Sequence, residues 1–216
     1  MLASFFLLST QDLAGQVNIK IGYLAGIGNF ETNNSLLSMY AVEGEELTKP
    51  FEHVSFMHGI QLGLRYKVNN LALVFGWENQ SRDRSALSFN AANDLFRERQ
   101  YNYTLNSFSL GVDNYIGAFL IGASVQSRKL SIDREINGNS LGLIDQSEFS
   151  YRITAGFTLQ RSELVSFEIR PFVQLPINDY NLENLATDLS ATTTDGDYTE
   201  SLRVIGISFV FYNGRQ

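Results

Sequence analysis

Apolar residues alternate with small or polar residues along most of this chain. From Ser55 to Val68, one face carries Phe56, His58, Ile60, Leu62, Leu64, Tyr66 and Val68, and the other carries Gly59, Gln61, Gly63, Arg65 and Lys67. The stretch from Phe149 to Gln160 repeats the alternation. Successive side chains of a strand point to opposite faces, whereas a helix would not keep a period of two. The pattern therefore predicts β-strands with one apolar and one polar face.

The distribution of charge indicates which face meets lipid. The polar faces contain arginine, lysine and glycine, while the apolar faces are almost free of charge. A water-soluble barrel with an apolar interior needs the opposite arrangement. Strands of outer-membrane barrels point apolar residues outward to the lipid and polar residues into the lumen. We therefore expect the apolar faces to contact lipid.

Eight such stretches follow one another, joined by links that are alternately long and short. The first six stretches are residues 16–28, 55–68, 70–80, 101–114, 119–128 and 149–160. The seventh includes residues 168–176, and the eighth is 201–212. Long links are expected at about 29–54, 81–100, 129–147 and 177–200, and short turns at 69–70, 115–117 and 161–163. An antiparallel meander places all long links at one end, and an even strand number lets the last strand pair with the first. The prediction is an all-β fold, an eight-stranded antiparallel up-and-down transmembrane β-barrel with short periplasmic turns, periplasmic termini and four long extracellular loops.

Two local features refine this prediction. In the stretch 101–114, one face carries Phe108, Leu110 and Val112 and the other carries Tyr101, Tyr103 and Leu105, which predicts a β-bulge near Asn106. Several aromatic residues fall near predicted strand ends, where an amphipathic ring suits the headgroup zone. They include Tyr23, Tyr66, Trp77, Tyr103, Tyr115, Tyr151 and Tyr212.

Two strands carry short motifs of a known kind. The segment from Val204 to Tyr212 has a glycine, alternating hydrophobic residues and a final aromatic residue, and it resembles the C-terminal assembly signal of bacterial outer-membrane barrels. The segment from Glu168 to Pro176 is similar to the proline-aromatic-x-x-x-proline strand of the PorT-like outer-membrane family, small barrels of the Bacteroidota. The resemblance implies a Gram-negative cell-envelope protein, with a role in a secretion or envelope complex and no catalytic residues. Because proline cannot donate to a strand ladder, Pro171 also predicts a local break in pairing.

Length and composition narrow the classes further. Strand-like patterning without a linker predicts one domain over residues 16–216, preceded by a signal peptide at residues 1–15 with an apolar run from Leu2 to Leu8. The alternative for those first residues is an apolar strand or terminal helix of an intracellular protein. No stretch approaches the roughly 20 apolar residues of a spanning helix. A net charge of −7 without a basic cluster argues against a nucleic-acid partner, and the absence of cysteine excludes disulfides and Cys-ligated zinc.

The faces assigned to the lumen collect more basic than acidic side chains. The basic residues are Lys20, Arg65, Lys67, Arg128, Arg152 and Arg170, and the acidic ones are Glu78 and Glu168. Buried charges need partners, and eight strands enclose only enough room for side chains. We expect a salt-bridged plug and no open pore. The alternative, a basic constriction or a gate for anions, would need a wider barrel.

Acidic residues concentrate in the first and fourth long links. The first link has Glu31, Glu43, Glu45, Glu46 and Glu52 with Lys49, and the fourth has Asp179, Glu183, Asp188, Asp195, Asp197 and Glu200. We expect solvated loop surface here; the alternative is a divalent-cation site or a docking face for a basic partner. The spacing of Leu36, Leu37, Met39, Tyr40 and Val42 predicts a short amphipathic helix that folds over the barrel mouth or meets a partner.

The two histidines, His53 and His58, are the only candidate histidine catalysts. His58 falls on the lipid face, and His53 with Glu52 and Ser55 forms a weak triad pattern. We therefore assign no catalytic, cofactor-binding or metal-binding residue. The sequence predicts a monomeric, non-enzymatic protein of the outer membrane, which is anchored in outer-membrane lipid and whose extracellular loops interact with a protein partner. The alternatives are a barrel enzyme acting on lipid or peptide and a soluble lipocalin-like carrier, whose apolar face would turn inward.

Overall fold

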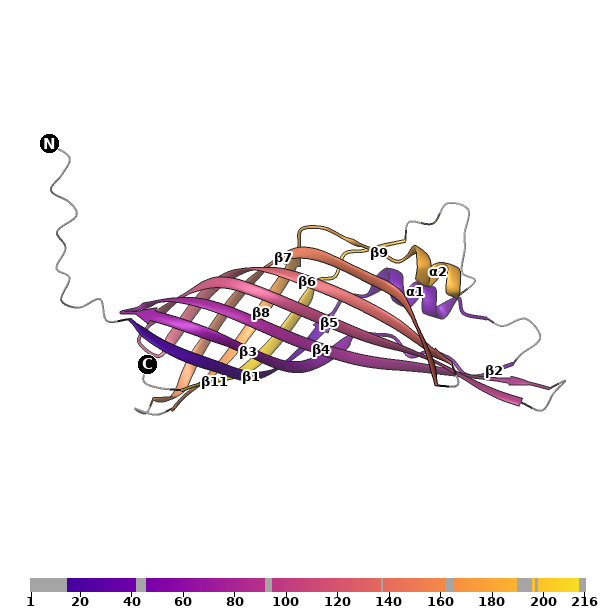
Figure 1. Ribbon diagram of the computed structural model, residues 1–216, viewed down its shortest axis with the longest axis horizontal. Coiled ribbons are helices and arrows are strands. Elements are labelled where there is room, and N and C mark those ends of the chain that lie inside the picture. Colours follow the sequence, from indigo (N-terminus) through magenta and orange to yellow (C-terminus); the bar gives the residue numbers. More distant parts are fainter. Residues whose placement is uncertain are drawn as a thin grey trace, which may run out of the picture.

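The computed structural model of the protein describes residues 15–41, 46–91, 95–136, 138–161, 165–189, 196 and 198–213. Across these residues, eight long antiparallel strands form a closed barrel (Figure 1). They are β1 (Gln16–Gly28), β3 (Phe56–Val68), β4 (Leu71–Asn90), β5 (Leu95–Ile116), β6 (Phe119–Ile136), β7 (Asn139–Arg161), β8 (Val165–Pro176) and β11 (Val204–Asn213). The predicted all-β barrel is confirmed.

The last strand closes the ring by pairing with the first. Gly26 of β1 lies opposite Gly206 of β11, as the even strand number predicts. Closure leaves no unpaired strand edge in the hydrocarbon region. Two of the predicted tight turns are present as well: Asn69 has φ 52° and Gly117 has φ 65°, both in the left-handed region that these residue types tolerate. β1 begins and β11 ends at the same end of the barrel as these turns (Figure 1).

Two of the four predicted long loops are instead strand hairpins. The link at 81–100 is occupied by β4, which continues to Asn90, and by β5, which begins at Leu95. The link at 129–147 is likewise taken up by β6, which ends at Ile136, and β7, which begins at Asn139. These four strands therefore extend well beyond the others at the extracellular end (Figure 1). The sequence pattern missed the extensions because polar residues predominate on their outer faces.

The outward-facing residues of the barrel change from apolar to polar across one row of paired residues. Asn79, Asn106, Lys129 and Ser147 are successive partners across β4 to β7, and we call this row the boundary line. On the periplasmic side of it the outward residues include Leu73, Phe75, Phe108, Leu110, Ile121 and Ile153. On the extracellular side they include Asp83, Asn102, Asp133 and Asp145. The boundary line therefore marks where the strands leave the lipid for water.

The inward-facing residues change in the opposite direction, from polar on the periplasmic side of the boundary line to apolar on the extracellular side. On the extracellular side of the boundary line, Tyr101, Tyr103, Leu130, Ile132 and Ile144 point inward and are at most 2% exposed. The predicted β-bulge near Asn106 is wrong, because β5 pairs with β4 and β6 there without a register shift. The apolar residues of β5 exchange faces because the strand passes from lipid, which favours apolar residues outside, into water, which favours them inside.

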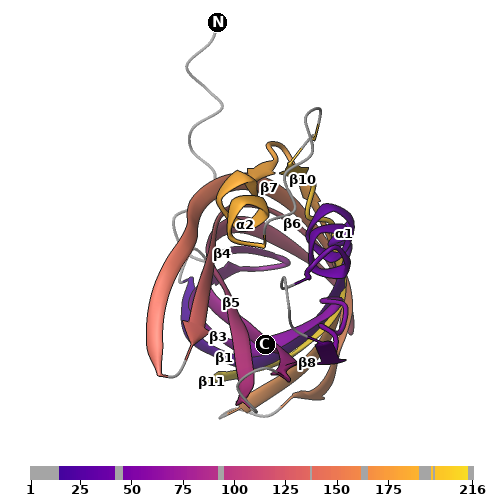
Figure 2. The same ribbon diagram turned by 90° about the vertical axis from the view of Figure 1, so that its right-hand side faces the viewer.

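The remaining two loops fold into the mouth of the barrel. The first contains α1 (Glu31–Ser38) and β2 (Glu46–Lys49), which pairs with β4, and the fourth contains β9 (Tyr180–Asn181), α2 (Glu183–Asp188) and β10 (Thr199–Glu200). Seen from the extracellular end, both helices lie at the mouth (Figure 2). Their apolar residues Leu36, Leu37 and Leu185 are buried. A helix is thus present at the mouth as predicted and carries Leu36 and Leu37, but it begins at Glu31 and ends at Ser38, so Met39 and Tyr40 follow it.

Some predictions fall on residues that the structure does not describe. These are nearly all of the expected signal peptide, residues 1–14, and Val42, Glu43, Glu45, Asp195 and Asp197 of the loops. Within the described ranges, neither helix is long and apolar enough to cross a membrane. The predicted break at Pro171 is observed: the pairs of β7 with β8 run to Thr154 opposite Phe172 and resume at Phe157 opposite Ile169.

Candidate functional site

The lumen on the periplasmic side of the boundary line is built around buried ion pairs. Arg65 of β3 is fully buried there. Its guanidinium donates hydrogen bonds to Glu168 at 3.1 Å, to the Tyr115 hydroxyl at 3.0 Å and to the side-chain oxygen of Asn18 at 2.9 and 3.1 Å. The group also stacks on Tyr212, 3.7 Å from the ring centroid. Such dense pairing compensates a charge that is removed from bulk water.

Two further ion pairs cross the lumen. Arg170 of β8 donates to Asp113 of β5 at 2.6 Å and to the Tyr212 hydroxyl at 2.9 Å. Arg152 of β7 holds both carboxylate oxygens of Glu78 on β4, with one of the two hydrogen bonds at 2.7 Å. Each pair joins strands that are three apart in the ring. The pairs therefore tie facing walls together across the lumen, which narrows any path along the barrel axis.

A fourth pair connects the polar lumen with the loop above it. Arg128 of β6 lies opposite Glu148 of β7 and forms an ion pair with it, both side chains being fully buried. The same guanidinium donates to the main-chain oxygen of Leu202 at 2.8 Å. The Tyr180 hydroxyl in turn donates to the main-chain oxygen of Arg128 at 3.3 Å. The fourth loop is thus bonded directly to the barrel interior.

The extracellular half of the lumen is filled by an apolar plug from the first and fourth loops. We define this plug as Phe30, Leu36, Leu37, Leu182, Leu185 and Leu189, all at most 3% exposed. It packs in one cluster with the inward residues of the strand extensions, such as Tyr101 and Ile132. The interior therefore has two tiers, one polar at membrane depth and one apolar above it.

Hydrogen bonds hold the two loops together. The Asn33 main-chain N–H donates to Glu200 at 2.8 Å, and the Thr32 hydroxyl donates to the main-chain oxygen of Thr199 at 2.6 Å. The Tyr103 hydroxyl donates to the side-chain oxygen of Asn33 at 3.0 Å. Burial raises the pKa of Glu200 to about 7, although the N–H of Asn33 opposes the shift. The contact between the loops is therefore sensitive to pH near neutrality.

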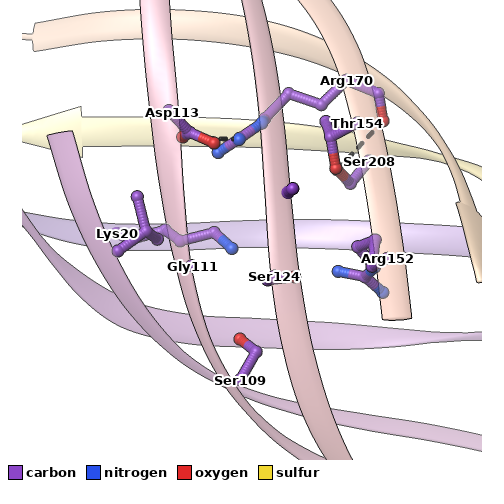
Figure 3. A pocket seen from close by; sticks show the side chains of 11 residues that line it. Lys20, Ser109, Gly111, Asp113, Ser124, Arg152, Thr154, Arg170 and Ser208 are labelled. Carbon is purple, nitrogen blue, oxygen red and sulfur yellow. Dashed lines mark hydrogen bonds and ion pairs between the residues drawn. The ribbon is translucent and has the colours of Figure 1, made fainter. Parts of the chain in front are cut away.

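A small polar cavity lies among the ion pairs of the lower tier (Figure 3). Its volume is about 30 Å³. Charged residues around it are Lys20, Asp113, Arg152 and Arg170, and hydroxyl-bearing neighbours include Ser109, Thr154 and Ser208. A cavity needs about 10–15 Å³ of such volume to hold one water molecule. The cavity therefore has room for a water molecule or a small ion and not for a larger ligand.

Most of the predicted lumen residues are where the sequence placed them. Lys20, Arg65, Glu78, Arg128, Arg152, Glu168 and Arg170 are all buried in the lumen, and the predicted salt-bridged interior is confirmed. Lys67 is half-buried, with its ammonium 4.4 Å from the ring centroid of Tyr115.

Sequence reasoning missed two acids and misplaced three tyrosines. Asp113 and Glu148 were not predicted as partners, although Asp113 shares a face with Ser109 and Gly111, opposite Val112, so the alternation could have found it. The headgroup position predicted for Tyr103, Tyr115 and Tyr212 is wrong, because all three point inward and are buried. The structure instead uses their hydroxyls as hydrogen-bond partners.

Among the described acidic loop residues, two depart from the expected solvated surface, Asp188 and Glu200. The others are exposed as predicted: Glu31, Glu46, Glu52, Asp179 and Glu183. Asp188 binds Arg134 and accepts a hydrogen bond from Tyr101 at 2.7 Å, and Glu200 is only 3% exposed. The bases that neutralise Asp188 come from neighbouring strands, not from its own loop, which sequence inspection of the loop could not reveal. Among the described residues, no group of three or more histidine or acidic side chains is arranged to hold a metal ion.

Two alternative functions make predictions about specific residues. A lipocalin-like carrier would expose Arg65, Arg152 and Glu78 to solvent, but all three are buried, so this alternative is contradicted. His58 lies on the outer face beside Tyr23, with ring centroids 5.9 Å apart, as predicted. His53 is exposed, and the described contact is made by its main-chain oxygen, which accepts hydrogen bonds from Arg84 at 2.8 and 3.0 Å.

The comparisons with known proteins identify the fold. No protein-family model and no curated protein sequence matches the chain. Among solved structures, Ail, the attachment invasion locus protein of Yersinia pestis, is similar with a TM-score of 0.50 and 13% identity, over 94% of this chain and 99% of that chain. Neisserial surface protein A is similar with a TM-score of 0.50 and 6% identity, over 92% of this chain and 96% of that one.

These similarities, the closed ring, the apolar outer belt and the polar lumen define the class. The chain is an eight-stranded outer-membrane β-barrel, and the outer membrane is its location.

Proposed function

We propose that this protein is a monomeric, non-enzymatic anchor of the bacterial cell envelope, which holds an extracellular β-structure out to a protein partner. The observation that carries the proposal is the two-tiered interior: ion pairs fill the membrane-spanning half, and the apolar plug fills the half above it. A barrel that is filled in this way suits anchoring better than conduction.

The part of the molecule that reaches farthest from the membrane supports the same proposal. The β4–β5 hairpin extends beyond the boundary line, and β2 pairs with β4 near its tip. Near that tip Leu95 is 52% exposed and Phe96 is 64% exposed, with Phe96 packed against Phe89 at 4.8 Å between ring centroids. Exposed apolar residues on the water side of the boundary line are suited to contacting another protein.

Conductance distinguishes an anchor from a channel. We expect purified protein in a planar lipid bilayer to show no steady ion conductance. As a control, the double substitution Leu36→Ser and Leu185→Ser loosens the apolar plug. We expect this variant to conduct no ions either, because the ion pairs of the lower tier still block the lumen. Steady conductance of the unmodified protein would refute the anchor proposal.

A cross-linking experiment tests the partner. A photo-reactive amino acid is introduced at Phe96, and at Ser131 on the outer face of β6 as a matched control. Intact cells expressing each variant are irradiated, and adducts are separated on gels. We expect one discrete protein adduct from the hairpin tip and none from the control position. No adduct at the tip, or equal adducts at both positions, would contradict the proposed partner surface.

The resemblance of the segment from Glu168 to Pro176 to PorT-like barrels of the Bacteroidota supports a finer proposal, that the partner belongs to a secretion or envelope complex. Deletion of the chain from its host should then impair secretion or envelope integrity, and the unmodified gene should restore it. A variant with Phe96→Ser and Leu95→Ser should fold normally and fail to restore the phenotype. Full restoration by that variant would show that the secretion or envelope phenotype does not depend on the hairpin tip.

A further inference from the structure

The charges in the polar lumen do not balance. Among the described residues buried at membrane depth, five are basic, Lys20, Arg65, Arg128, Arg152 and Arg170, and four are acidic, Glu78, Asp113, Glu148 and Glu168. Each arginine forms an ion pair with one of the acids. The lysine is the remaining cation.

Lys20 is 5% exposed, and its ammonium makes no hydrogen bond or ion pair with the described part of the chain. The acids that influence it electrostatically are Glu78 and Asp113. Both are already engaged, Glu78 by two hydrogen bonds from Arg152 and Asp113 by Arg170 at 2.6 Å. An uncompensated ammonium that is buried away from bulk water is strongly unfavourable.

The ammonium instead faces the small cavity described above. Figure 3 shows Lys20 directed toward the middle of that cavity, with Arg152 and Arg170 on other sides of it. Gly76 borders the same space: a β-carbon there would lie 2.7 Å from the Ser109 hydroxyl oxygen and in ordinary contact with the Lys20 Nζ, at 3.7 Å. Three cations therefore surround a polar space, and among the described residues Asp113 is the one acid that lines it.

We propose that this cavity binds a small monovalent inorganic anion, such as chloride, with the Lys20 ammonium as its principal ligand. The anion would supply the missing negative charge and accept hydrogen bonds from the ammonium. The hydroxyl of Thr154, which also lines the cavity, can donate another. The volume of about 30 Å³ admits a monatomic ion and excludes a carboxylate-bearing metabolite.

Folding in different salts tests the proposal. The full chain is folded into detergent micelles at constant ionic strength, in either sodium chloride or sodium gluconate, whose anion is too large for the cavity. At ten times the dissociation constant, an anion that binds only the folded state raises the folded-to-unfolded ratio about elevenfold. We expect the unfolding midpoint of the unmodified protein to rise with chloride and not with gluconate.

Two lysine variants provide the comparison. Lys20→Met removes the ligand and the unpaired charge, so its midpoint should not respond to chloride and should be at least as high as that of the unmodified protein in gluconate. Lys129→Met removes an equal charge from the surface, where the lysine is 50% exposed and pairs with Asp145 at 2.8 Å, and it should keep the chloride response. A chloride response that survives Lys20→Met would refute the site.

Diffraction supplies a readout that does not depend on a variant folding. Crystals of the unmodified protein folded in sodium bromide should show one anomalous scatterer beside Lys20. Water alone in the cavity would refute the proposal. Neither result bears on conductance or on the cross-link at the hairpin tip, so the anion site and the proposed function can fail separately.

Discussion

The substitution Arg65→Met tests whether the ion-pair network stabilises the barrel. Arg65 makes four hydrogen bonds, one to Glu168, one to Tyr115 and two to Asn18, and it stacks on Tyr212. Methionine keeps much of the side-chain volume and removes the charge. Glu168 then retains the hydrogen bond from Tyr115 at 3.1 Å and Arg170 at a distance of 3.8 Å.

These remaining contacts set the expected magnitude. Removing one partner of a buried ion pair destabilises a protein by about 3–5 kcal/mol, because the other charge is left uncompensated. Glu168 is only partly uncompensated, so we expect a loss of about 3 kcal/mol in the free energy of unfolding, at the lower end of that range. With a urea dependence of about 2 kcal/mol per molar, the unfolding midpoint should fall by about 1.5 M.

The folded fraction can be measured from the faster migration of unheated protein on gels after incubation in urea. Adding Glu168→Gln to Arg65→Met removes the uncompensated charge, so the double variant should recover part of the loss. An unchanged midpoint for Arg65→Met would show that the network does not stabilise the fold. A double variant whose loss equals the sum of the two single losses would show that the two residues do not interact energetically.

Three further predictions concern the membrane boundary, the loops and the strand contacts. Leu110→Arg should lower the free energy of unfolding of the barrel in lipid vesicles by about 2–4 kcal/mol. Asn102→Arg, on the same face of β5 but beyond the boundary line, should lower it by about 1 kcal/mol or less. Equal losses of stability in urea titrations would contradict the position of the boundary line. Because burial raises the pKa of Glu200 from 4.5 to about 7, its contribution to the loop contact is complete below pH 4.5 and is lost as the pH rises through about 7. Hydrogen-exchange protection of α1, corrected for intrinsic rates, should therefore fall between pH 5 and pH 8, and Glu200→Gln should abolish this dependence. Gly59→Ala places a β-carbon 1.7 Å from a main-chain oxygen of β4 and should lower the folded yield, while Gly142→Ala, where the nearest atom is 3.3 Å away on a side chain, should fold normally.

The alternation of residues was enough to predict the barrel, because each membrane strand has one face toward lipid and one toward the lumen, and its residues differ accordingly. In β3, Leu62 and Leu64 point to lipid while Gln61 and Arg65 point to the lumen, so the period of two, the facing of the strand and the polar interior could all be read from the sequence. The closing pair of β1 and β11 followed from the even strand number and needed no other information.

The strand extensions could not be read in this way. On the far side of Asn106 the apolar residues of β5 change faces, because water surrounds the outside of the barrel and the loops fill its inside. A local pattern shows that Tyr101 and Leu110 lie on opposite faces, and it does not show that lipid surrounds only one of them. The change was therefore mistaken for a β-bulge.

The sequence alone thus determined the strands, the lipid-facing surface and most of the charged lumen, because these depend on alternation within single strands. The tertiary structure decided which charges meet. Asp113 with Arg170 and Glu78 with Arg152 join strands that are three apart in the ring, and Asp188 of α2 obtains its basic partner, Arg134, from β6. Only the closed ring fixes those distances, and only the finished set of pairs shows that Lys20 is left facing a cavity.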